Sequence, residues 1–149
     1  MSLDELYQEV ILDHYKNPRC RGCLAKSDAS SALYNPLCGD KVELSVAVKD
    51  GKVNEIAFSG QGCSISQASA SMMSELCKGK TLEEASRRLS EFRALMRGDK
   101  KEEELVQLGD VVALGGVRKF SARVKCAMLA WEALEKCMQE LGQDKRNSR

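Results

Sequence analysis

The chain has 149 residues, of which 43% are hydrophobic and 30% charged, and this size and composition fit one globular domain. Its 23 lysines and arginines nearly balance 22 aspartates and glutamates, so the chain lacks the basic field that gathers nucleic acid or anionic lipid. No apolar run approaches the roughly 20 residues of a membrane-spanning helix, and the first residues do not have the pattern of a signal peptide. We therefore expect a cytoplasmic protein with no nucleic-acid partner and no membrane partner.

The first predicted element is an amphipathic helix over residues 2–16. Ser2 and Glu5 form a capping box at its start, and Asn17-Pro18 ends it. Residues 19–37 are rich in Gly, Ser, Asn and Pro, which predicts mostly loop, with Leu33 and Tyr34 as the one place for a short edge strand.

The middle of the chain predicts a hairpin followed by helices. Apolar and polar residues alternate from 41 to 59 around an Asp50-Gly51 turn. Residues 111–117 are apolar but interrupted by two glycines, which favours a short helix or turn. Helical spacing of apolar residues predicts three further helices, at 64–78, 81–97 and 121–141. The predicted fold class is α+β, with a small antiparallel sheet of about three strands packed against several α-helices.

Seven cysteines occur beside a single histidine, and they are the unusual feature of the composition. In a reducing compartment such cysteines are thiols or metal ligands rather than disulfides. Three of them occupy special positions: Cys38 just before the hairpin, Cys63 in the glycine turn before a helix, and Cys126 early in the last helix. A helix N-terminus favours the thiolate form of Cys63, which makes it a better nucleophile and ligand.

Asp40 follows Cys38 by two residues, so in extended chain the two side chains share one face. Three sulfurs and this carboxylate complete a tetrahedral metal site, and glycines on both sides let the backbone fold tightly around it. The predicted metal ligands are therefore Cys38, Asp40, Cys63 and Cys126. The alternative is that these cysteines bind no metal and are buried, unreactive thiols.

Four segments of the chain resemble the U-type scaffold family of iron–sulfur cluster assembly, which includes the IscU proteins and the NifU N-terminal domain. The resemblance extends from Leu6 to about Leu141, and three cysteine motifs occur in the order of the family. The matching segments are YQEVILDHYKNP (7–18), NPLCGD (35–40), GQGCSISQASASMM (60–73) and ARVKCAMLAWEAL (122–134).

Within that family the chain resembles the SufU subtype more than the IscU subtype. An extra charged helical insertion lies at about 81–104 of a single domain spanning 1–149. Lys125 occupies the place of a histidine of IscU-type chains, and residues 120–124 read FSARV where those chains carry a chaperone-binding LPPVK motif. Handoff of clusters through that chaperone is therefore not expected.

The resemblance implies a SufE/IscU-like fold and a zinc-binding partner of a SufS-type cysteine desulfurase. Such a protein accepts persulfide sulfur and passes it toward downstream assembly components or apoproteins. Cys38 is the candidate persulfide acceptor, and Cys126 is the runner-up. Lys125 cannot bind zinc while it is an ammonium ion, and it is a candidate switch partner of Asp40 when metal leaves. If the protein is an enzyme, it is a zinc-dependent sulfurtransferase.

Three other functions remain open from the sequence. A non-catalytic scaffold would hold iron or a [2Fe–2S] cluster on Cys38, Cys63 and Cys126 and transfer it to apoproteins. A structural zinc-binding interaction module would use the basic stretch 118–125 for docking. A Cys-His hydrolase ranks last, because it needs a positioned imidazole and finds only His14.

The remaining cysteines have simpler expected roles. Cys20 and Cys23 form a CxxC pair without a second pair, which favours two ordinary loop thiols over half of a zinc site. Cys77 and Cys137 lie inside predicted helices and are expected to serve in packing. His14 lies on the apolar face of the first helix, where a packing or capping role is expected.

Overall fold

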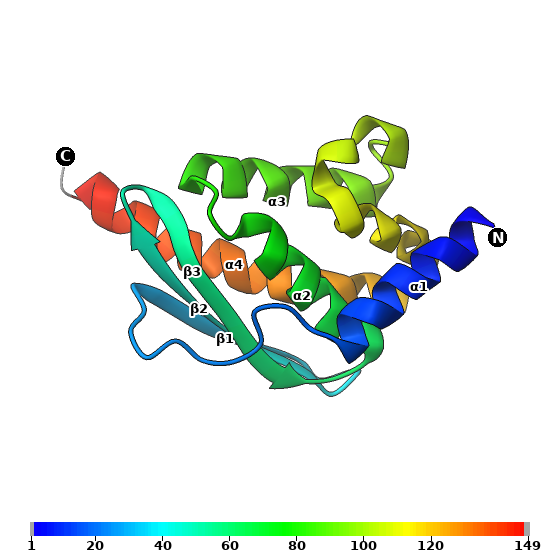
Figure 1. Ribbon diagram of the computed structural model, residues 1–149, viewed down its shortest axis with the longest axis horizontal. Helices are drawn as coiled ribbons and strands as arrows, with labels where there is room; N and C mark the ends of the chain where they lie inside the picture. The colour runs from blue at the N-terminus through cyan, green and yellow to red at the C-terminus, as the bar shows by residue number, and fades with distance from the viewer. Residues whose placement is uncertain (1, 148–149) are drawn as a thin grey trace.

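One antiparallel sheet with helices against it makes up the fold (Figure 1). The computed structural model describes the backbone of residues 2–147 and the side chains of residues 2–142. The strands, in sheet order, are β1 (Ala29–Asn35), β2 (Asp40–Lys49) and β3 (Lys52–Gln61). The helices are α1 (Leu3–Lys16), α2 (Ser64–Cys77), α3 (Leu82–Arg97) and α4 (Ser121–Asn147), with 3₁₀ segments η1 (Glu102–Glu104) and η2 (Val106–Lys119). The predicted α+β class with a three-stranded sheet is confirmed.

The helices form layers on the sheet. α4 packs along β1 and β2, and α2 packs against β3. α1 lies on α2 and η2, whereas α3 packs against η2 and α4 (Figure 1). Alternate residues of β2, beginning with Asp40, are buried on the side that these helices cover. This alternation is the period-2 pattern that predicted the strand.

Local sequence signals set the start of the helices and the turn of the hairpin. Ser2 Oγ accepts a hydrogen bond from the Glu5 N–H at 3.2 Å, and Thr81 Oγ1 accepts one from the Glu84 N–H at 3.0 Å. The β2–β3 turn has positive φ at Asp50 and Gly51, 55° and 74°. These values match the turn type whose twist suits a two-residue hairpin. The predicted cap at Ser2 and the predicted turn are confirmed.

Residues 19–37 are mostly loop and contain the predicted edge strand at Leu33 and Tyr34, but this strand, β1, is longer than predicted. All of β1 pairs with β2, from Ala29 opposite Val46 to Asn35 opposite Asp40. Its other support comes from α4, because Ser31 Oγ donates a hydrogen bond to the Ala133 carbonyl at 2.8 Å. The serines and alanines of this segment have weak strand propensity, so tertiary contacts rather than local preference determine the strand.

The last helix and the segment before it are longer than predicted. α4 continues to Asn147, and η2 begins at Val106 instead of Val111. A kink at Gly109, with φ of 58° and ψ of −132°, interrupts η2. Within the described part of the chain, no helix, α4 included, has the length and apolar character needed to cross a membrane.

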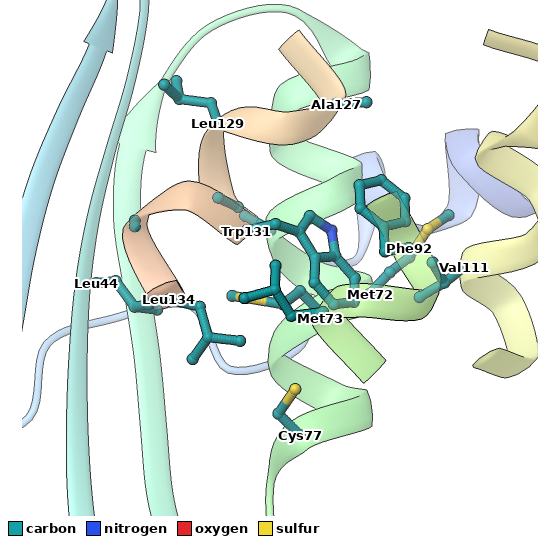
Figure 2. Packing of buried hydrophobic residues seen from close by; sticks show 14 of the residues in the cluster. Leu44, Met72, Met73, Cys77, Phe92, Val111, Ala127, Leu129, Trp131 and Leu134 are labelled. Atoms are coloured by element: carbon teal, nitrogen blue, oxygen red, sulfur yellow. The ribbon is translucent and has the colours of Figure 1, made fainter. Parts of the chain in front are cut away.

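Trp131 of α4 lies at the centre of the hydrophobic core (Figure 2). Its ring stacks on Phe92 of α3 with centroids 4.4 Å apart and an interplanar angle of 14°. The indole Nε1–H donates to Ser69 Oγ at 3.1 Å, and Ser69 donates to the Ala127 carbonyl at 2.6 Å. The core therefore joins α2, α3 and α4 through stacking and through satisfied hydrogen bonds.

Cys77 and Cys137 are fully buried, as expected for packing residues. Burial raises the pKa of the Cys77 thiol to about 12. It also raises the pKa of Cys137, although a hydrogen bond with Ser31 partly opposes that shift. Both groups are therefore neutral, inert thiols at neutral pH.

His14 ties α1 to α2 and η2. The side chain is fully buried, with Nδ1 2.8 Å from Ser71 Oγ and Nε2 2.9 Å from Asp110 Oδ2. Ser71 Oγ also accepts a hydrogen bond from the Arg19 backbone N–H at 2.8 Å. Every group in this network has a partner if the Ser71 hydroxyl donates to His14 Nδ1 and the His14 Nε2–H donates to Asp110. His14 thus has the structural role expected from the sequence.

His14→Ala is expected to lower the free energy of unfolding by about 2–4 kcal/mol, because it removes two hydrogen bonds and leaves a cavity beneath α1. Urea denaturation of the metal-free protein measures the effect. Tyr15→Ala is the matched control, since the neighbouring Tyr15 is 44% exposed. A loss in His14→Ala no larger than in Tyr15→Ala would contradict the proposed role of this network.

Candidate metal centre

Three chain segments meet at one end of the sheet, and together they carry the four predicted metal ligands. β2 begins at Asp40, and Cys38 lies in the turn just before it. β3 ends at Gln61, and Cys63 follows in the turn that leads into α2. Cys126 lies in the second turn of α4. In Figure 1 this is the end of the sheet nearer α1. We call these four predicted ligands the metal centre.

The sulfur atoms of Cys38 and Cys126 lie 3.2 Å apart. Cys126 is fully buried, whereas Cys38 is half-buried. One ligand atom each from Cys38, Asp40 and Cys126 lies within 4.8 Å of the other two. Zn–S bonds of about 2.3 Å in a tetrahedron place two sulfurs roughly 3.8 Å apart. The spacing of these groups is therefore close to that of ligands around one cation.

Asp40 joins Cys63 to this group. The Cys63 backbone N–H donates to Asp40 Oδ1 at 2.8 Å, and Cys63 Sγ lies 3.9 Å from Asp40 Oδ2. Cys63 is the N-cap of α2, and its sulfur accepts a hydrogen bond from the Ser66 N–H at 3.5 Å. The helix N-terminus thus faces the sulfur, as the sequence predicts. Asp40 is 1% exposed, so its carboxylate is directed into this interior rather than to solvent.

Asn35 also contributes to the site, although the sequence predicts no role for this residue. It is buried, its carbonyl accepts the Cys38 N–H at 3.2 Å, and its Oδ1 accepts the Leu37 N–H at 3.3 Å. Its Nδ2–H donates to Cys126 Sγ at 3.9 Å. Asn35 therefore shapes the turn of Cys38 and also contacts a second ligand. An Asn before Pro at a turn is the sequence signal that points to such a role.

Arg123, part of the basic stretch 118–125, is a second residue beside the site. Its side chain contacts the Cys126 thiol, and this contact, followed by the charge of Cys63, raises the pKa of the guanidinium. Arg123 precedes Cys126 by three residues, a spacing that places both on one helix face and that serves as the sequence signal. Lys125 is exposed, and among the ion pairs of the described side chains none joins it to Asp40. Its pairing with Asp40 after metal release stays a prediction.

The chemistry of these donors fits a cation. Burial raises the pKa of Cys126, and hydrogen bonds with Cys38 and Asp40 and the charge of Cys63 raise it further. The cause is that four groups with anionic deprotonated forms crowd one small volume. A bound cation offsets their mutual repulsion, and three thiolates with one carboxylate are a donor set that Zn²⁺ accepts.

The other chemically interesting side chains lie outside this group. Cys20 and Cys23 are free thiols on the segment that runs beside β3, where Arg21 forms a bridge to Phe58. Burial raises the pKa of Cys20, with smaller effects of opposite sign from the charges of Lys78 and Glu75 at the far end of α2. The group of ligand atoms around Cys38 includes neither cysteine.

The fold has helices on a three-stranded sheet, and cysteines lie together at one end of it. Comparison with known families identifies the class of proteins that has these features. The model of the NifU-like N terminal domain family matches residues 6–127. The chain belongs to this family, as the resemblance of its cysteine motifs predicts.

Individual relatives agree with the family. The chain is 48% identical over 135 residues to the zinc-dependent sulfurtransferase SufU of Bacillus subtilis, covering 91% of this chain and 90% of that protein. It is 40% identical over 136 residues to the iron–sulfur cluster assembly scaffold protein IscU of Streptococcus pyogenes, covering 91% and 84%. A crystal structure from Fervidobacterium islandicum, named for a scaffold protein of the SUF system, superimposes with a TM-score of 0.82 at 31% identity, covering 92% and 99%.

Proposed function

We propose that this protein acts in iron–sulfur cluster assembly as a zinc-binding sulfur acceptor. It takes persulfide sulfur from a SufS-type cysteine desulfurase and passes it toward nascent clusters. The observation that carries the proposal is the group of Cys38, Asp40 and Cys126, whose ligand atoms lie within 4.8 Å of one another, with Cys63 Sγ 3.9 Å from the buried Asp40 carboxylate. The name of the Bacillus subtilis relative, a zinc-dependent sulfurtransferase, supports the same function.

Cys38, Asp40, Cys63 and Cys126 are the residues that would hold zinc. When bound, zinc keeps its cysteine ligands in the thiolate form and protects them from oxidation. The chain itself supplies the positioning. Asp40 holds the turn of Cys63 by accepting its backbone N–H, and the Asn35 carbonyl holds the turn of Cys38 in the same way.

Cys38 is the proposed acceptor of sulfur. It lies in a turn beside Leu37, which is 80% exposed, whereas Cys126 is buried. In the transfer, the Cys38 thiolate attacks the terminal sulfur of the donor persulfide, and a new S–S bond forms at Cys38 Sγ. The S–S bond within the donor breaks, and the donor cysteine leaves as a thiolate. Cys126, with its sulfur 3.2 Å from that of Cys38, is the second candidate.

A scaffold for a [2Fe–2S] cluster is the second candidate function. The observation that favours it is the similarity to proteins named IscU, including the one from Streptococcus pyogenes. The same thiolates can ligate iron or zinc, because both metals accept sulfur ligands. The two functions therefore use one set of residues and differ in cargo.

Metal analysis of untagged protein, purified anaerobically without added metal, separates these functions. The sulfur acceptor is expected to contain near-stoichiometric zinc with little iron or acid-labile sulfide. Matched iron and sulfide that are lost in Cys38→Ser would favour the scaffold instead. A folded protein that binds none of these metals would contradict both functions.

Cys38→Ser is expected to abolish persulfide formation when the protein is incubated with a SufS-type desulfurase and cysteine. Mass spectrometry of peptides after alkylation locates the added sulfur. Cys23→Ser is the matched control, since Cys23 is an exposed thiol outside the metal centre, and it is expected to accept sulfur as the unmodified protein does. Persulfide on Cys126 in Cys38→Ser, at an undiminished rate, would identify Cys126 as the acceptor.

A further inference from the structure

We infer that the cavity between α1, η2 and the first turns of α2 and α4 receives an apolar side chain from an acidic surface segment of the sulfur donor. This inference rests on the proposed function, because it names the surface through which the donor would dock. The cavity lies outside the metal centre and contains none of its ligands.

The cavity is large and mostly apolar. Its volume is about 550 Å³. Ile11 of α1, Ile65 of α2 and Val117 of η2 line it, and Phe120 contributes a ring that is 64% exposed. Pockets that hold ligands or anchor side chains have volumes of roughly 300–1,000 Å³ and similar linings. An exposed aromatic residue beside such a cavity is typical of a surface that a partner covers.

The cavity adjoins the metal centre. Ser64, which lines it, directly follows Cys63 in the chain. Arg123 also lines the cavity, and it lies one turn before Cys126 on the same face of α4. A macromolecule that delivers sulfur to these cysteines must therefore approach the surface beside this cavity.

The charges around the cavity indicate the kind of segment that fits. Lys119 and Arg123 line the side formed by η2 and α4. Among the described side chains, neither cation forms an ion pair with a carboxylate. Asp4 and Tyr7 of α1 line the opposite side, and Asp4 is the acidic residue of this lining. The cavity is therefore positive on the side of the metal centre and negative beyond it, which orients an acidic segment toward Arg123.

A second copy of this chain fits the surface less well. A two-fold contact centred on this region would place Lys119 and Arg123 against the same residues of the other copy. Like charges placed face to face are unfavourable. A partner with acidic residues around an apolar anchor meets both requirements of the surface.

Gly116→Leu tests the inference by filling the cavity. Gly116 lines it, and an added Cβ there meets no atom within 4 Å. Gly142→Leu is the matched control, because Gly142 is equally open and lies in α4 roughly 24 Å along the helix axis from Cys126. Zinc-loaded full-length variants are titrated with a SufS-type desulfurase, and sulfur transfer is measured from the desulfurase and from glutathione persulfide.

Gly116→Leu is expected to keep its zinc, bind the desulfurase at least tenfold more weakly, and still accept sulfur from glutathione persulfide. Gly142→Leu is expected to match the unmodified protein in all three measurements. Unchanged desulfurase affinity in Gly116→Leu would overturn the inference while leaving the proposed function intact. If the unmodified protein accepts no sulfur from either source, the proposed function itself is wrong.

Lys119→Glu provides a second variant that leaves the apolar wall unchanged. Its exposed side chain makes a folding defect unexpected, and desulfurase affinity should fall at low salt and approach that of the unmodified protein at high salt. An affinity independent of this charge would overturn the acidic occupant. Sedimentation tests whether a second copy occupies the cavity instead. That would be the case if the protein forms a dimer that Gly116→Leu dissociates while desulfurase binding stays unchanged.

Discussion

Asp40→Asn is expected to lower zinc affinity by more than the roughly 10–100-fold that loss of an outer-shell partner costs, without unfolding the protein. The asparagine keeps an oxygen that accepts the Cys63 N–H, now 2.8 Å from Asp40 Oδ1, but it removes the negative charge. Asp40→Ala removes both, and the orphaned N–H should cost a further 1–3 kcal/mol or so in stability. Competition with a chromophoric chelator gives the affinities, and urea denaturation of the metal-free forms gives the stabilities.

The comparison of the two variants separates the roles of Asp40. Asp50→Asn is the matched control, since it makes the same chemical change in the exposed β2–β3 turn, where asparagine tolerates a φ of 55°. Its zinc affinity should equal that of the unmodified protein. If Asp40→Asn also retained that affinity, Asp40 would be a structural acceptor for the Cys63 turn and not a zinc ligand.

The elements that the sequence predicts well are those with local causes. The Ser2 cap, the Asp50-Gly51 turn and the N-terminal position of Cys63 on α2 depend on neighbours a few residues away. Such signals are readable from the sequence because the interacting groups are fixed by spacing alone. The juxtaposition of Cys38 and Asp40 belongs to the same kind, since only Gly39 lies between them.

The elements that the sequence predicts poorly depend on distant contacts. β1 exists because β2 pairs with it and because Ser31 reaches the Ala133 carbonyl of α4. The contact between Asn35 and Cys126 spans 91 residues, so no local pattern contains it. Sequence spacing also gave no sign of the cavity beside Arg123, because α1, η2 and two other helices form its walls. Information of this kind resides in the packing of the whole chain.

Gly62→Ala is expected to disrupt zinc binding as strongly as the loss of a ligand does. Gly62 has φ of 153°, and a Cβ added there would overlap Asp40 Oδ1 and lie 2.7 Å from Ser66 Oγ. Asp40 is buried and bonded to the next residue, Cys63, so it cannot turn away without breaking that hydrogen bond. The substitution therefore displaces the carboxylate or the turn of Cys63, although it alters no ligand. Chelator competition measures the zinc affinity, which should fall by at least about 100-fold by analogy with the upper range for outer-shell changes.

Gly79→Ala distinguishes steric overlap from backbone strain. Gly79 also has positive φ, 84°, but an added Cβ meets no atom within 4 Å. This control should cost roughly 1–2 kcal/mol in stability, the usual penalty for an L-residue in left-handed conformation, and leave zinc affinity unchanged. Equal zinc affinities in Gly62→Ala and Gly79→Ala would mean that the position of Asp40 has no influence on the metal. A loss of zinc affinity confined to Gly62→Ala would show that the backbone must approach the Asp40 carboxylate closely at this turn. Only glycine permits that approach, and it would then be what places Asp40 beside the three sulfurs.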